Sequence, residues 1–133
     1  MTRVQLRLVS VLLTLFVANT WFIGGTANSS VTTCPSGAAC LWEHKDYNGC
    51  RLVLYSGDSN LNTNSPCGFA FGDDTSSAKN RTGHIVVLCD DRDFMGGVVD
   101  KLSAGENINQ VIPNDAVTSV YFADTSCPGD YED

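Results

Sequence analysis

Two short blocks of this sequence combine carboxylates with hydroxyl groups, the combination best suited to chemistry in this chain. The first is Gly72-Asp73-Asp74-Thr75-Ser76-Ser77, and the second is Asn114-Asp115-Ala116-Val117-Thr118-Ser119. Calcium takes roughly six to eight oxygens from carboxylates, hydroxyls and backbone carbonyls. Both blocks are therefore candidate calcium ligands. The alternative is a turn in which the aspartate and serine side chains hydrogen-bond locally and serve only folding.

Other reactive groups are few. His44 and His84 are the two histidines, and a nucleophilic site would need a serine or free cysteine and an orienting acid beside one of them. Neither lies in a recognisable motif, and the sequence has no P-loop, GxGxxG or HExxH pattern. Asp90, Asp91 and Asp93 form the densest acidic cluster, which we interpret as a solvated turn rather than a cation site or a glycosidase pair. We therefore expect a binding protein and not an enzyme.

The first 27 residues have the three parts of a secretory signal. Two arginines precede an apolar run over residues 8–18, and small residues follow at the expected cleavage point. A transmembrane anchor is the alternative, but Asn19 and Thr20 interrupt the run before it reaches the ~20 apolar residues that a spanning helix needs. We expect a signal peptide over 1–27, a single mature domain over 28–133, and a secreted, extracellular protein.

The mature chain is strongly acidic. Cleavage removes two of the eight basic residues and none of the fifteen acidic ones, which leaves a net charge of −9. Such a chain repels nucleic acid and anionic membranes. We expect no nucleic-acid partner, no membrane association after cleavage, and a monomer that suits cations or basic proteins.

Six cysteines, all in the mature part, indicate three disulfides. Sequence alone permits about fifteen pairings. Nearness in the chain, and placement within one unit of the repeat described next, favour Cys34 with Cys40, Cys50 with Cys67, and Cys89 with Cys127. Zinc ligation is the alternative, but the chain has no CxxC pair.

The mature sequence contains one unit twice. Residues 41–49 align without gaps on residues 88–96 at an offset of 47, and the two hydroxyl-rich blocks align at an offset of 42. Because both blocks recur in the same order, we infer a duplicated unit of about 45 residues. Unit one covers about 38–82 and unit two about 84–123, followed by a short acidic tail over 124–133.

Each unit has the pattern of short β-strands. Residues 51–55 alternate, residues 84–88 form a continuous apolar run, and residues 119–122 are rich in branched and aromatic side chains. The mature part shows no helical periodicity with caps. About eight short strands in two units predict an all-β sandwich of two packed sheets, held by disulfides.

An Asp-aromatic-x-Gly segment in each unit predicts a tight hairpin. Glycine tolerates the positive φ that such a fold-back needs, and the aromatic ring can then lie over the hairpin. A serine from each hydroxyl-rich block is expected to hydrogen-bond the hairpin backbone. The residues of this signature are Trp42, Tyr47, Gly49 and Ser77 in unit one, and Phe94, Gly96 and Ser119 in unit two.

This doubled signature resembles that of the βγ-crystallins. The opening segment, Cys34-Pro35-Ser36-Gly37-Ala38-Ala39-Cys40-Leu41-Trp42-Glu43, is similar to the start of small secreted actinobacterial proteins classed with metalloproteinase inhibitors of that fold. The resemblance covers nearly all of residues 34–122 and implies a βγ-crystallin-type sandwich of two Greek-key motifs. Unit two departs from the signature, because Cys89 stands where unit one has Trp42.

The resemblance also implies two calcium sites formed crosswise between the units. One would use Asp73 with the Ala116 carbonyl and the Thr118 hydroxyl. The other would use Asp115 with the Asp74 carbonyl and the Ser76 hydroxyl. Gly72 departs from the pattern, which has Asn or Asp at that position.

The function that the resemblance implies is inhibition of a secreted metalloprotease, by a loop presented to the protease cleft. No inhibitory residue can be carried over, so the inhibitory loop is not assigned. The alternative is a calcium-binding extracellular module with a structural, stress-related or toxin-like use.

Overall fold

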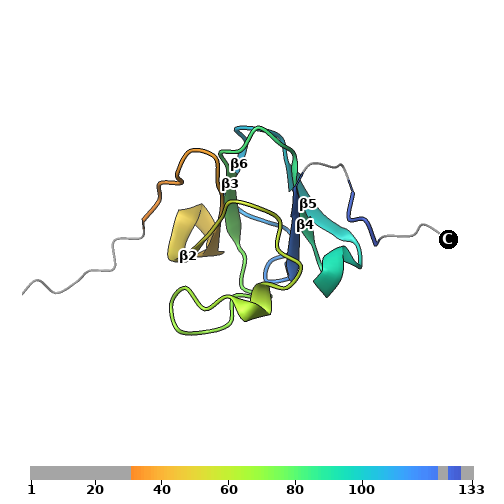
Figure 1. The fold of residues 1–133 in the computed structure, drawn as a ribbon. Helices are drawn as coiled ribbons and strands as arrows, with labels where there is room; N and C mark the ends of the chain where they lie inside the picture. The colour runs from red at the N-terminus through yellow and green to blue at the C-terminus, as the bar shows by residue number, and fades with distance from the viewer. Residues whose placement is uncertain (1–30, 123–125, 130–133) are drawn as a thin grey trace, which may run out of the picture.

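A computed structural model describes residues 31–122 and 126–129 of the chain and shows two packed β-sheets (Figure 1). The expected signal peptide, the expected start at Asn28 and most of the acidic tail lie outside the described residues. Within the described part, no helix is long and apolar enough to cross a membrane.

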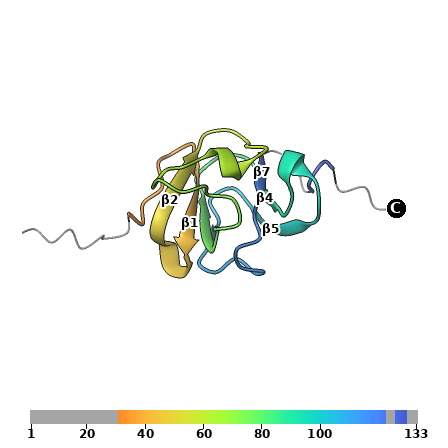
Figure 2. The ribbon, with the colours of Figure 1, turned by 90° about the horizontal axis from the view of Figure 1, so that it is seen from below.

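Each sheet is antiparallel and consists mainly of strands from one unit. The first has the order β2-β1-β3-β6, formed by β1 (Ala39–His44), β2 (Asn48–Leu54), β3 (Ser77–Asn80) and β6 (Asn107–Ile108). The second has the order β5-β4-β7, formed by β4 (Val86–Cys89), β5 (Val98–Leu102) and β7 (Ser119–Phe122). Short 3-10 turns lie at η1 (Lys45–Tyr47), η2 (Leu61–Thr63) and η3 (Arg92–Phe94). Figure 2 shows the two sheets side by side.

The two units exchange their third segments. β6 belongs to unit two but pairs with β3 of unit one, with Ala78 opposite Ile108. In return, Asp58 of unit one forms an isolated bridge with Val120 of β7. This bridge stands where the eighth expected strand would lie, so the described residues form seven strands and the prediction of eight was wrong. The reason is local: the Asp58 carboxylate accepts a hydrogen bond from the backbone N–H of Asn60 at 2.8 Å, which turns the chain away.

The main hydrophobic core lies between the two sheets. Side chains alternate along each strand, so that every second residue faces this core. The fully buried members are Leu41, Leu61, Phe71, Leu88, Leu102, Val111, Val117 and Val120, with Ala39, Leu52, Leu54, Ala78 and Val86 almost completely buried beside them. Both units therefore contribute to a single core.

A smaller cluster covers the outer face of each sheet and is closed by a disulfide. On the first sheet, Trp42 packs with the Cys34–Cys40 disulfide. On the second, Val87 packs with the Cys89–Cys127 disulfide. A third disulfide, Cys50–Cys67, joins β2 to the long loop after η2. These are the three pairs that the sequence favours.

Candidate functional site

The last serine of each hydroxyl-rich block ties down the hairpin of its own unit. The fully buried Ser77 hydroxyl donates to the carbonyl of His44 at 2.7 Å and accepts from the backbone N–H of Tyr47 at 3.0 Å. The buried Ser119 hydroxyl likewise donates to the carbonyl of Asp91 and accepts from the N–H of Phe94 at 3.2 Å. The duplication therefore extends to individual hydrogen bonds.

An acidic side chain closes each hairpin from the other end. The Glu43 carboxylate accepts from the N–H of Cys50 at 3.1 Å, and the Asp90 carboxylate accepts from the N–H of Gly97 at 2.9 Å. A side chain at Gly96, where φ is +70°, would collide with Asp90. Asp90, from the densest acidic cluster, is therefore engaged in holding its hairpin.

The aromatic residue of each hairpin contacts another aromatic ring, but the partner comes from a different position in each unit. Trp42 and Tyr47 meet edge to face, with ring centroids 5.4 Å apart. Burial, and secondarily the adjacent Asp46 carboxylate, raise the pKa of Tyr47. In unit two the pair is Phe94 with Tyr121, at 5.1 Å. In unit two, Cys89 takes the position of Trp42. Cys89 pairs with Ser119 across the sheet, just as Trp42 pairs with Ser77.

The two hydroxyl-rich blocks meet each other crosswise. The Thr118 hydroxyl donates to the Asp73 carboxylate at 2.7 Å, and the Ser76 hydroxyl lies 3.2 Å from the Asp115 carboxylate. Each contact joins an aspartate of one unit to a hydroxyl of the other. Asp73 and Asp115 both have left-handed backbone conformations, with φ of 61° and 55°. The structure thus brings together the aspartate and hydroxyl of each predicted calcium site.

Further groups surround these pairs. Ser76 also donates to the carbonyl of Glu43 at 2.7 Å, which places a backbone oxygen beside the Ser76–Asp115 pair. An open depression next to it is lined by His44, Lys45, Ser76, Gln110 and Asn114. Asp74 and Ala116, whose carbonyls are predicted ligands, are half-buried within the same two blocks.

The electrostatic environment of this region is acidic. Burial, followed by the negative charges of Glu43, Asp115 and Asp73, raises the pKa of Asp74, while His44 acts in the opposite direction. These carboxylates therefore repel one another when all are ionised. A bound cation would relieve this repulsion.

Asn62 explains why unit one can have glycine at the start of its block. A Cβ at Gly72 would collide with the Asn62 carboxamide. An Asn or Asp at position 72 would therefore need Asn62 to move. The Asn62 carboxamide therefore occupies the space that an Asn or Asp side chain at position 72 would take.

Carboxylates alone do not build a metal site in the described residues, where no group of three or more His, Cys, Asp or Glu could hold a metal ion. Any calcium bound at the crosswise pairs would need hydroxyl and carbonyl oxygens as well. His44 has a largely exposed side chain that lies 3.9 Å from the Glu43 carboxylate.

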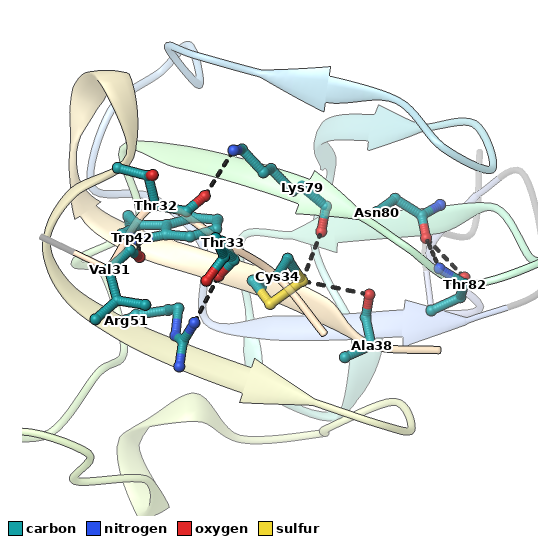
Figure 3. Close-up of a disulfide and its surroundings, with 11 residues drawn as sticks. Val31, Thr32, Thr33, Cys34, Ala38, Trp42, Arg51, Lys79, Asn80 and Thr82 are labelled. Atoms are coloured by element: carbon teal, nitrogen blue, oxygen red, sulfur yellow. Dashed lines mark hydrogen bonds between the residues drawn. A yellow bond between two sulfur atoms is a disulfide. The ribbon is translucent and has the colours of Figure 1, made fainter. Parts of the chain in front are cut away.

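Residues 31–34, which we call the strap, lie across the outer face of the first sheet (Figure 3). Three side chains from three strands donate to three consecutive backbone carbonyls. Trp42 donates to Val31 at 2.8 Å, Lys79 to Thr32 at 2.6 Å, and Arg51 to Thr33. The Lys79 ammonium also lies 4.0 Å from the centre of the Tyr47 ring, a cation–π contact. The strap is therefore fixed by its backbone, and it covers Trp42.

Comparison with known proteins identifies the family. The profile of peptidase inhibitor family I36 matches residues 27–102, more than half of the chain. The chain belongs to peptidase inhibitor family I36. The matched region of this I36 protein includes the strap and β1–β5, and ends before β6 and β7. No curated protein gives a significant match.

Solved structures place this I36 domain on the βγ-crystallin fold. A domain described under the evolution of the eye lens βγ-crystallin fold has a TM-score of 0.61 at 20% identity, covering 72% of this chain and 95% of that one. A βγ-crystallin from Ciona intestinalis has a TM-score of 0.55 at 27% identity, with coverage of 65% and 99%. A βγ-crystallin domain from Clostridium beijerinckii has a TM-score of 0.50 at 21% identity, with coverage of 66% and 99%. The predicted βγ-crystallin-type fold is confirmed.

Several residues that shape this I36 domain carry little signal in the sequence. The strap donors Arg51 and Lys79, and the Asn62 carboxamide beside Gly72, make contacts across long stretches of chain or between loops. The acid shared by both units, Glu43 and Asp90, was visible as part of the repeat. The repeat alone does not show that its side chain closes the hairpin.

Proposed function

We propose that this protein is a secreted inhibitor of an extracellular metalloprotease. Membership of a peptidase inhibitor family carries the proposal and favours a protease as partner and a non-enzymatic role. The metalloprotease class comes from the resemblance of the opening cysteine-flanked segment and the doubled signature.

The architecture suits such a role. Three disulfides and a core shared between both units hold the connecting loops on a rigid scaffold. A loop that is ordered before binding loses less conformational entropy on binding, which strengthens association.

The test is titration of the purified mature protein against secreted metallo-, serine and cysteine proteases. We expect tight, active-site-competitive inhibition of at least one thermolysin-like metalloprotease. Calcium is held constant throughout, since such enzymes themselves depend on it. Full protease activity across the panel at micromolar protein would refute the proposal and favour the second function below.

We propose calcium binding as a second function, favoured by the crosswise contacts. Asp73 with Thr118, and Asp115 with Ser76, place a carboxylate and a hydroxyl from different units side by side. The carbonyl beside Ser76 adds a third oxygen to the second pair. Calcium prefers such oxygen ligands, and extracellular modules bind it with dissociation constants as weak as about 10⁻⁴ to 10⁻³ M.

Calorimetry and thermal melts in calcium against EDTA test this function. Calcium at about 100 times its dissociation constant would stabilise the native state by about 2.7 kcal/mol. Asp115→Ala and Asp73→Ala each remove one carboxylate, and Asp115→Ala is expected to lose more because its pair has the additional carbonyl. Identical melts in about 100 mM calcium and in EDTA, without heat of binding, would leave both blocks as folding turns.

We also propose that the chain is exported and begins at Asn28 after cleavage. Disulfide content and the inhibitor family are consistent with an extracellular location. Mass spectrometry of the secreted protein tests the start. A secreted chain that retains Met1 would contradict it.

A further inference from the structure

The duplication offers an internal comparison that isolates one loop. In unit one, the N–H of Leu61 donates to the carbonyl of Thr118 at 2.8 Å; in unit two, the N–H of Val111 donates to the carbonyl of Ser76 at 2.8 Å. Leu61 and Val111 are both fully buried in the shared core. They are equivalent points of the two Greek keys.

A second pair of equivalent bonds lies just downstream. The N–H of Asp73 donates to the carbonyl of Val117 at 3.0 Å, and the N–H of Asp115 donates to the carbonyl of Thr75 at 3.2 Å. Between these two anchor points unit two needs three residues, 112–114, whereas unit one uses eleven, 62–72. The fold therefore closes with a three-residue bridge, and most of the loop over 62–72 exceeds what the fold requires.

The loop over 62–72 is nevertheless well anchored. Leu61, just before the loop, and Phe71, near its end, are both buried in the core. The Asn62 carboxamide meets Gly72 at the base of the loop, and the Cys50–Cys67 disulfide joins its middle to β2. The N–H of Phe71 donates to the carbonyl of Asn64 at 3.0 Å. In Figure 1 this loop projects away from the two sheets. Compact loops whose ends meet in this way are frequently functional.

Residues 65–70, the exposed part of the loop around Cys67, are uncharged and expose an aromatic side chain. Residues 65–70 are all exposed, and none of the fifteen acidic or eight basic residues lies within 62–72. The chain turns at Gly68, which has a positive φ of 89°, and the side chain of the next residue, Phe69, is 38% exposed. The centres of protein interfaces are depleted in charge and enriched in aromatic anchors. Phe71 and Cys67 account for how the loop is held, but they do not account for an exposed Phe69.

We propose that residues 65–70 are the segment that enters the protease cleft, with Phe69 filling an apolar specificity pocket. This inference rests on the proposed inhibitory function and adds its binding site. The disulfide and the buried flanking residues order the segment in advance, so that Phe69 is presented without a large ordering cost.

The experiment compares the inhibition constants of three proteins against the metalloprotease that the wild-type protein inhibits best. Phe69→Ala removes the anchor. Ile112→Ala is the matched control, because Ile112 lies on the equivalent bridge of unit two and is 69% exposed. Both variants change exposed side chains, and thermal melts verify that they fold. We expect Phe69→Ala to raise the inhibition constant at least about 30-fold, as for an interface hot spot, and Ile112→Ala to leave it nearly unchanged.

The outcomes separate the two proposals. A wild-type protein that inhibits no protease overturns the proposed function, and this binding site with it. If the wild-type protein inhibits and Phe69→Ala inhibits as strongly as the wild type, the proposed binding site alone is overturned. The same holds if Ile112→Ala loses as much inhibition as Phe69→Ala. Hydrogen exchange of the wild-type complex gives an independent measurement: residues 65–70 are expected to become protected, and unchanged exchange there contradicts the proposal.

Discussion

Removal of the buried serine hydroxyl at Ser77 is expected to destabilise the whole domain. This hydroxyl satisfies two backbone groups at once, the carbonyl of His44 and the N–H of Tyr47. The hairpin that it holds contains two consecutive left-handed non-glycine residues, Asp46 and Tyr47, with φ of 57° and 60°. Such conformations cost of order 1 kcal/mol each and persist only where surrounding contacts maintain them. In Ser77→Ala these contacts are lost.

The magnitude follows from the two bonds. Leaving a buried donor or acceptor unpaired costs about 1–3 kcal/mol, and the hairpin recovers part of this cost by relaxing toward solvent. We therefore expect Ser77→Ala to lower the free energy of unfolding by about 2 kcal/mol. For a domain of this size, that corresponds to a fall in Tm of about 10 °C. Ser119→Ala removes the equivalent bonds to Asp91 and Phe94, and is expected to cost a similar amount.

Thermal and urea denaturation with the disulfides intact measure both variants. Ser56→Ala, at an exposed position, is the control and is expected to stay within about 0.5 kcal/mol of the wild-type protein. If Ser77→Ala unfolds with the wild-type free energy, then the hydroxyl does not hold the hairpin, and the reasoning from the duplicated hydrogen bonds is refuted.

Three further predictions concern other parts of the structure. Because the pKa of Asp74 is raised in the folded state, its stabilising contribution is present below the ordinary pKa of an aspartate and is lost as pH rises through the raised value. In EDTA, Asp74→Asn is therefore expected to raise Tm at neutral pH but not near pH ~3. Equal shifts of Tm at both pH values would contradict this. Asn80→Ala is expected to cost about 3 kcal/mol in urea denaturation, because the two N–H groups of the buried carboxamide are shared among three carbonyls and its oxygen accepts from a neighbouring threonine. A loss below about 1 kcal/mol would show that these bonds are dispensable. In a protein that starts at the proposed Asn28, Trp42 is the sole tryptophan, and it is expected to gain acrylamide quenching in an Arg51→Ala/Lys79→Ala double variant. Wild-type quenching in that variant would mean that the strap stays in place without its donors.

The sequence predicts the parts of this fold that repeat within it. The Asp-aromatic-x-Gly segment and the final serine of the following block recur in the same order in both units, which predicts that Ser77 and Ser119 hydrogen-bond the hairpins of their own units, and both serines do so. The aspartates and hydroxyls of the two blocks were expected to meet crosswise from resemblance to a known fold. Nothing in the spacing alone brings Asp73 to Thr118.

The sequence does not reveal features that have no counterpart in the other unit. The strap contacts of Arg51 and Lys79 depend on which carbonyls the docked chain presents, and no local pattern encodes that choice. The buried Asn80 shows the same difficulty: its carboxamide reaches the carbonyls of Leu102 and Ser103, more than twenty residues away. The loop over 62–72 is composed of ordinary turn residues, and its excess length becomes visible only when equivalent hydrogen bonds identify the ends of the bridge in unit two.

The exchange of segments between the units has a consequence for biosynthesis. A chain made from its N-terminus completes β3 at Asn80, but the strand that covers the edge of β3 begins only at Asn107. Until β6 emerges, the nascent first unit has an open strand edge that can pair with a neighbouring molecule. Its two disulfides, Cys34–Cys40 and Cys50–Cys67, can already close and lock this incomplete half. Truncation before Asn107 is therefore expected to yield aggregates and not a functional half-domain.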